Sequence, residues 1–180
     1  MKRSRIVAVL LTALVIIAYV STTLGRAIYE GQSPGLGSFA AVHFAGYLFF
    51  LLMPVEALVP VYEAEGHAGA TLILIAVSTA LVAQLIDYGI GRAFSDWVIE
   101  KVVGQDRYDR VRATIEKWGG AAIFFFNLLP LSSPNMLLVS GIVRYSAPKA
   151  FFFSFVGLTA KYVAIVYLVD LSGWWAELGR

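Results

Sequence analysis

The stretch AGATLILIAVSTALVAQLI, which runs from Ala68 to Ile86, decides the fold class. It contains no charged side chain, and its length is close to the ~20 residues with which an α-helix crosses ~30 Å of hydrocarbon. The chain continues through Gly91 to Arg92 before charged residues become frequent. We therefore expect a transmembrane span over residues 68–92.

The composition of the whole chain agrees with a membrane protein. Hydrophobic residues make up 59% of the sequence and charged residues only 14%, and the mean hydropathy is strongly positive. No linker or low-complexity tract divides residues 1–180, so we expect one domain. Cysteine is absent, which excludes disulfides and thiol chemistry. The net charge of +2 is spread along the chain, so we expect no nucleic-acid partner.

Two further apolar segments predict spans at the two ends of the chain. Residues 6–24 follow three basic residues near the amino terminus and form the first span. A cleaved signal peptide is the alternative, although an A-x-A-like cleavage site is not evident. Residues 149–171 form the last span and contain Lys161 well away from either end.

Two other apolar segments are interrupted by proline and polar residues. In residues 36–66, Pro54 and Pro60 bracket Glu56. In residues 119–143, the middle holds six such residues: Asn127, Pro130, Ser132, Ser133, Pro134 and Asn135. Proline breaks the helical hydrogen-bond ladder, and a bilayer tolerates the break only where protein or water satisfies the freed groups. We expect a span plus a re-entrant hairpin over 36–66 and a second re-entrant hairpin over 119–143.

Residues 95–118 form a charged connector between the two halves. Apolar residues recur in it at spacings of three and four, which predicts an amphipathic helix: Tyr108, Val111, Ile115 and Trp118. The helix either packs as a solvated connector or lies in the headgroup layer.

The order of these elements predicts an all-α integral membrane protein with two inverted repeats. Each repeat is a re-entrant hairpin followed by a transmembrane helix, and such paired interruptions point to a substrate site between the halves. A single bundle with two kinked helices is the alternative.

Three ionisable side chains lie within or at the edge of apolar segments: Glu56, Asp87 and Lys161. A charge at the bilayer centre costs ~2.5–3.5 kcal/mol on insertion scales, so these groups must face protein or water. Glu56 either cycles a proton while Lys161 binds a phosphate, or Lys161 forms a fixed ion pair with Glu56 or Asp87. For Asp87 we favour a structural role beside Arg92.

The neutral polar residues of the second hairpin have two interpretations. Asn127 and Ser133 could line a headgroup cavity, or they could cap freed backbone groups. His43 and His67 are far apart and have no carboxylate at ligand spacing, so we expect no metal or other cofactor. No catalytic motif is visible, so we expect no enzyme, and intramembrane hydrolysis is only a weak alternative.

Several motifs resemble the DedA family, also called the VTT-domain or SNARE-associated Golgi protein family. The first hairpin of that family has a Glu, a Pro and a second Glu, which Glu56, Pro60 and Glu65 match. The segment ending at Arg92 is similar to the family's Tyr-x-Ile-Gly-Arg helix end, and Pro130 and Gly141 match its second hairpin.

The chain departs from the family where its second hairpin usually has two Arg residues, because Asn127 and Ser133 stand there. We therefore expect a divergent member. The resemblance implies a transporter, either a flippase or a scramblase, for a membrane lipid or polyprenyl phosphate, with proton coupling as an option. A membrane scaffold that transports nothing is the alternative. The substrate or proton site would comprise Glu56, Pro60, Glu65, Asn127, Pro130, Ser133 and Lys161, with Asp87, Arg92 and Gly141 in supporting roles.

The distribution of Lys and Arg predicts the topology. Hairpins that return to the side from which they enter leave most basic residues on one face, which would be the cytoplasmic face of a prokaryotic cell membrane. In intact cells, cysteines introduced singly at Ser4 and Gln105 should therefore resist an impermeant thiol reagent added outside. A cysteine at Arg180 is the control, because it should react. Labelling at Ser4 or Gln105 would refute this topology.

Overall fold

The computed structural model describes residues 35–48, 55–99, 104–129 and 133–178. This part of the chain forms helices and turns and contains no strand, which confirms the all-α prediction. The predicted first span, 6–24, lies outside it. The helices are α2 (Leu36–Leu48), the 3₁₀ helix η1 (Val55–Ala57), α3 (Leu58–Ala64), α4 (Gly69–Val98), α5 (Gln105–Leu128), α6 (Ser133–Ile142) and α7 (Ala147–Leu178).

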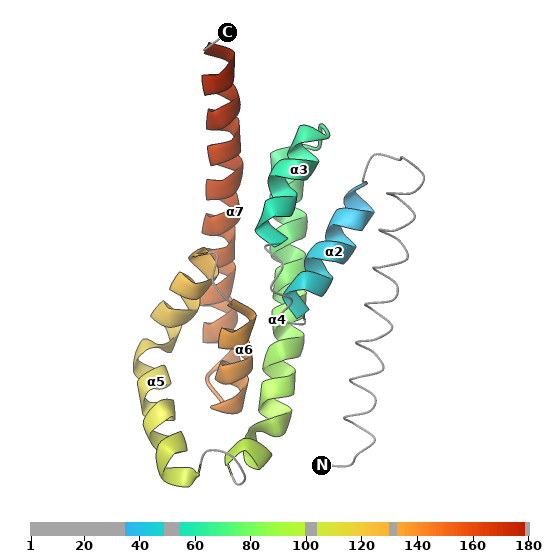
Figure 1. The fold of residues 1–180 in the computed structure, drawn as a ribbon. Helices are drawn as coiled ribbons and strands as arrows, with labels where there is room; N and C mark the ends of the chain where they lie inside the picture. The colour runs from blue at the N-terminus through green and yellow to red at the C-terminus, as the bar shows by residue number, and fades with distance from the viewer. Residues whose placement is uncertain (1–34, 49–54, 100–103, 130–132, 179–180) are drawn as a thin grey trace.

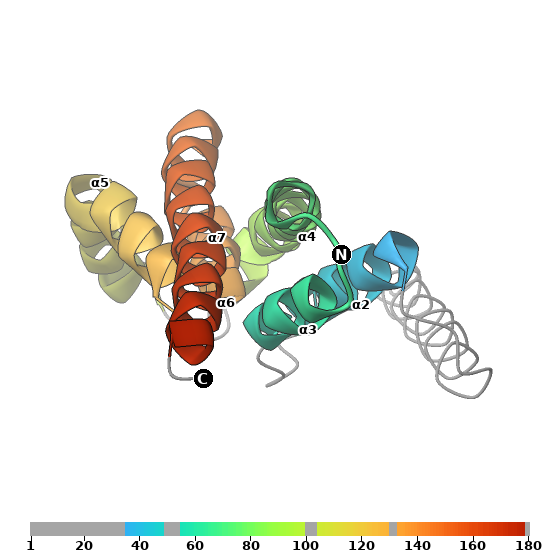
Figure 2. The same cartoon turned by 90° about the horizontal axis from the view of Figure 1, so that it is seen from above.

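The two long apolar helices, α4 and α7, contact one another near the middle of the structure (Figures 1 and 2). Within them, Gly69–Trp97 and Ala147–Val169 are long and apolar enough to cross a membrane. The predicted spans 68–92 and 149–171 fall on these helices. Helix α2 flanks α4, and α5 flanks α7, so each long helix has a neighbour on its outer side (Figure 2).

The predicted boundary between connector and second hairpin at Gly119 is not a helix end, because α5 continues through it to Leu128. Glycine costs only about 1 kcal/mol relative to alanine inside a helix, and packing offsets that cost. Gly120 lies close to the Phe153 ring, and Gly119 lies close to the Tyr145 ring. After α5, helix α6 returns along it in the opposite direction (Figure 1). Its position relative to the bilayer stays a prediction, as does that of α3.

The charged half of α5 is only partly packed. Tyr108 is buried and Ile115 is half-buried, and both lie in the second apolar cluster. Val111 and Trp118 are exposed, so the predicted apolar stripe is divided between the protein and its surroundings.

The same turn closes both interrupted segments and leads into the long helices. At the end of α3, the amide of His67 donates to the carbonyl of Tyr62, and Gly66 has a φ of 91°. At the end of α6, the amide of Tyr145 donates to the carbonyl of Ser140, and Arg144 has a φ of 57°. Both are helix ends of the Schellman type, in which the residue with positive φ adopts the left-handed backbone conformation. The two halves therefore share a local backbone motif at corresponding places.

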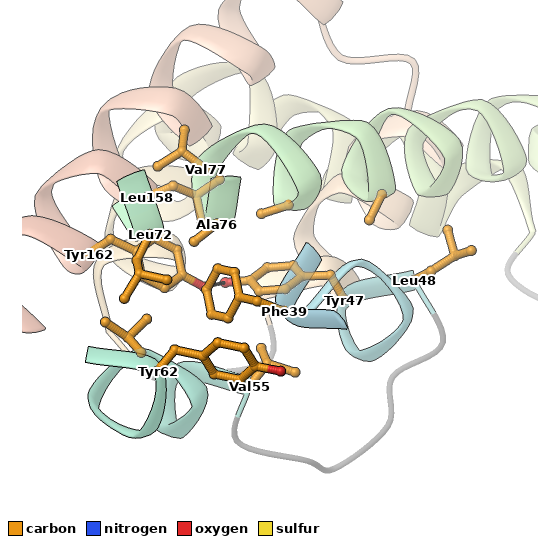
Figure 3. Packing of buried hydrophobic residues seen from close by; sticks show 13 residues of the cluster. Phe39, Tyr47, Leu48, Val55, Tyr62, Leu72, Ala76, Val77, Leu158 and Tyr162 are labelled. Carbon is orange, nitrogen blue, oxygen red and sulfur yellow. Dashed lines mark hydrogen bonds between the residues drawn. The ribbon is translucent and has the colours of Figure 1, made fainter. Parts of the chain in front are cut away.

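Two apolar clusters form the interior. The first joins α2, α3, α4 and α7, and Figure 3 shows Phe39 and Tyr62 packed beside Tyr47 and Tyr162. The second joins α4, α5, α6 and the start of α7, around Ile123 and Leu137. Helix α4 contributes to both clusters, so it connects the two halves.

Helices α4 and α6 cross at two glycines. A Cβ built on Gly91 would collide with the backbone carbonyl of Leu138, and one built on Gly141 would collide with the backbone carbonyl of Tyr88. Backbone cannot move aside as a flexible side chain can, so this crossing requires glycine on both helices. Gly141 therefore has a packing role.

Substitution of these glycines tests the crossing. Gly91→Ala and Gly141→Ala should each destabilise the protein by about 1–3 kcal/mol, because the added methyl group forces the helices apart. Gly89→Ala is the matched control on α4, since nothing lies within 4 Å of its built Cβ. Unfolding in detergent measures the effect. Equal stability of Gly141→Ala and Gly89→Ala would contradict the crossing as described.

Candidate functional site

Lys161 lies on the apolar helix α7 with its side chain only 3% exposed. Its ammonium donates one hydrogen bond of 2.7 Å to the Glu56 carboxylate and another of 2.6 Å to the Tyr47 hydroxyl. The rings of Tyr47 and Tyr162 have their centroids 5.3 and 5.2 Å from the nitrogen, within cation–π range. A buried ammonium is thus held by one carboxylate, one hydroxyl and two aromatic faces.

The local sequence places Glu56 opposite this ammonium. It lies in η1, directly before α3, whose third residue is Pro60. Proline is tolerated in the first turn of a helix, where its missing amide would have had no intrahelical partner. Pro60 therefore lies in the first turn of a new helix that follows Glu56. The Glu56 side chain is 18% exposed, so it reaches both Lys161 and the surroundings.

A line of neutral polar groups continues from Lys161 into the interior. The Tyr162 and Tyr47 hydroxyls are 3.3 Å apart, and they point toward one another in Figure 3. The Tyr162 hydroxyl is 2.5 Å from Nε2 of His43, and Nδ1 of His43 is 2.8 Å from the Thr79 hydroxyl. Sequence analysis missed these residues. The available signal was the spacing of four between His43 and Tyr47, which places both on one helix face.

A second polar cluster joins α4, α5 and α7. The amide nitrogen of Gln84 donates a 2.6 Å hydrogen bond to the Asn127 side chain, and the Ser154 hydroxyl donates to the amide oxygen of Gln84. The Asn127 nitrogen donates to the carbonyl of Ile123. All three side chains of the cluster are fully buried. Asn127 was predicted to bind a headgroup, and its two hydrogen bonds in the structure are with Gln84 and with the carbonyl of Ile123.

Three further residues of the predicted site are not among the described hydrogen-bond partners of Lys161. Glu65 is exposed at the end of α3. Pro130 lies outside the described residues, as does the side chain of Ser133, the first residue of α6.

The structure does not form the expected Asp87–Arg92 contact. Arg92 is exposed and its guanidinium lies 3.5 Å from the Tyr88 hydroxyl, whereas Asp87 is buried. Five residues along a helix correspond to about 140° of rotation, so the two side chains leave α4 on different sides. Within the described residues, Oδ2 of Asp87 has no hydrogen-bond partner.

The site as a whole suits recognition of an anion and movement of a proton. It offers a buried cation, a carboxylate that reaches outward and a row of hydroxyl and imidazole groups behind them. In the part of the chain that the structure describes, no three His, Asp or Glu residues gather as a metal site would require.

Comparison with known proteins agrees with the earlier resemblance. The sequence model of the VTT domain matches residues 36–171, which is most of the 180-residue chain and includes Glu56 and Lys161. No curated protein and no solved structure matches the chain. From this match and the two long apolar helices, we conclude that the chain is a membrane protein of the DedA/VTT family.

Proposed function

We propose that the protein is a flippase or scramblase for an anionic lipid or a lipid phosphate, in which Lys161 binds the phosphate when Glu56 takes up a proton. One observation carries the proposal: an ammonium that is 3% exposed on a membrane helix has a single carboxylate partner among the described residues. Ionisable groups inside membrane proteins usually mark a substrate or ion path.

In this proposal, Glu56 and a phosphate have the same role toward Lys161. A buried ammonium left without an anion is destabilised by ~3–5 kcal/mol, so a negative partner beside it is strongly favoured. The ionised Glu56 carboxylate supplies that charge in the structure, at 2.7 Å. A proton on Glu56 would remove the charge, and an anionic headgroup would then be the partner that satisfies the ammonium.

The two members of the pair come from different halves of the chain. Glu56 belongs to the interrupted segment before α4, and Lys161 belongs to α7, which follows the second interrupted segment. Relative movement of the halves would therefore separate the carboxylate from the ammonium. Replacement of Glu56 by a substrate anion would then be coupled to movement of the halves, as an alternating-access site between two repeats requires.

The absence of the family's two Arg residues fits this assignment. Asn127 stands at the first of those positions, and its hydrogen bonds go to Gln84 and Ile123. Lys161 would then be the principal cation for the phosphate. We propose membrane lipids or polyprenyl phosphates as substrates and no enzymatic reaction.

Reconstitution into liposomes tests the proposal. Wild-type protein should move a fluorescent anionic lipid or polyprenyl phosphate across the bilayer. Lys161→Met should reduce this rate by about tenfold to a hundredfold, which corresponds to one charge-assisted hydrogen bond of ~1.5–3 kcal/mol. Glu56→Gln imitates the protonated acid, so it should still bind the anionic lipid but lose the pH dependence of transport.

Glu116→Gln is the matched control, because it removes the same charge from an exposed position on α5. It should transport as the wild type does. Size-exclusion profiles and melting temperatures establish that every variant is folded. If the wild type moves no lipid, the protein is a scaffold and not a transporter. If folded Lys161→Met transports normally, the assignment of Lys161 is wrong.

A further inference from the structure

His43 is surrounded by groups that fix its hydrogen-bonding pattern. It is fully buried on α2, with Tyr47 stacked on it from one turn further along the helix and the Tyr162 ring tilted against it. The ionisable groups that face it from the packed elements are Tyr162 and Lys161 of α7, with Glu56 of η1 behind Lys161. Helix α4 presents only the uncharged Thr79.

The Thr79 hydroxyl lies between two groups that compete for its single hydrogen. The carbonyl oxygen of Ile75 on the same helix and Nδ1 of His43 each lie 2.8 Å from its oxygen. When the hydroxyl donates to Ile75, it accepts from Nδ1. In that arrangement Nδ1 carries a hydrogen, and the neutral imidazole has its lone pair on Nε2.

The Tyr162 hydroxyl faces that lone pair and can point in two directions. In one state it donates to Nε2 of His43, 2.5 Å away. In the other it donates to the Tyr47 hydroxyl, 3.3 Å away, which is the direction that the oxygen geometry favours. The hydroxyl has one hydrogen, so it can donate toward Tyr47 only when Nε2 carries a hydrogen of its own.

We propose that Nε2 of His43 is a proton-binding site whose occupancy sets the direction of the Tyr162 hydroxyl and links His43 to the Lys161–Glu56 pair. This proposal rests on the proposed function insofar as it concerns proton coupling. Protonation forms one N–H bond on Nε2 and turns the Tyr162 hydroxyl from Nε2 toward Tyr47.

The chain of contacts also supplies a balanced route for the proton. In the state in which Tyr162 donates to Nε2 and Tyr47 donates to Tyr162, the transfers begin at Nε2, which takes the hydrogen of Tyr162. Tyr162 is then refilled by Tyr47, Tyr47 by the Lys161 ammonium, and Lys161 by protonated Glu56. The net change is an ionised Glu56 and a protonated His43, with no oxidant or reductant involved.

Nitrogen NMR on histidine tests the proton site without any transport assay. The chain has two histidines, so His67→Gln leaves His43 as the sole ¹⁵N-histidine signal. In nanodiscs, the neutral imidazole should carry its hydrogen on Nδ1, although free histidine in water prefers Nε2. Acidification within the folded range should convert Nε2 to N–H while Nδ1–H is retained. A neutral imidazole with its hydrogen on Nε2, or an Nε2 that never gains a hydrogen, would overturn the proposal.

Thr79→Val is the matched variant for the tautomer, because it keeps the shape of the side chain and removes the acceptor. We expect the hydrogen of neutral His43 to move from Nδ1 to Nε2 in this variant. An unchanged tautomer would show that Thr79 does not fix it, against the proposal.

Transport measurements separate this site from the proposed function. His43→Asn keeps a donor toward Thr79 but has no counterpart of Nε2. It should lose the acceleration of anionic-lipid movement by a proton gradient, which His67→Gln should keep. Retained acceleration would overturn the role of His43. Wild-type protein that moves no lipid would refute the proposed function, while the NMR result would still decide whether Nε2 binds a proton.

Discussion

The structure depends on one constraint, which is that the ammonium of Lys161 lies inside an apolar helix and must be satisfied there. Water cannot do this at 3% exposure, so the neighbouring elements provide the carboxylate of Glu56, the hydroxyl of Tyr47 and two aromatic rings. This requirement explains why η1 and α3 fold back against α7. It also explains why α2, which carries Tyr47 and His43, packs in the same cluster.

If the two halves are repeats, the Asn127–Gln84 contact of the second polar cluster corresponds to the Glu56–Lys161 contact. Glu56 precedes Pro60 in the first interrupted segment and bonds to the long helix of the second half. Asn127 precedes Pro130 in the second segment and bonds to Gln84 on the long helix of the first half. One contact is charged and reaches outward, and the other is neutral and fully buried. This difference suggests that the first contact exchanges partners while the second holds the helices together.

The sequence predicted the features that carry a large energetic cost. The long apolar spans and the need for a partner at Lys161 follow from the cost of charge and open backbone in hydrocarbon. Tyr47, Tyr162 and Thr79 could not be found in this way, because neutral hydroxyl groups are tolerated in many environments. Asn127 had two possible roles, and the sequence could not show its contact with Gln84, which lies 43 residues away along the chain.

The errors have equally local causes. The predicted Asp87–Arg92 contact is wrong because the prediction used proximity in sequence and ignored the rotation of side chains around the helix. The predicted helix end at Gly119 is wrong because packing against Tyr145 and Phe153 outweighs the low helix propensity of glycine. Membrane topology and re-entrance stay predictions, because they concern the position of the chain in a bilayer.

A double-mutant cycle on the free energy of unfolding tests the central claim most directly. Glu56→Gln and Lys161→Met, singly and together, remove the two members of the pair, and each single change should cost ~3–5 kcal/mol because the other group loses its partner. The account predicts that the double variant is less destabilised than the sum of the two, with an interaction energy of about 0.5–3 kcal/mol. Strict additivity would contradict it, because Lys161 would then be stabilised without Glu56.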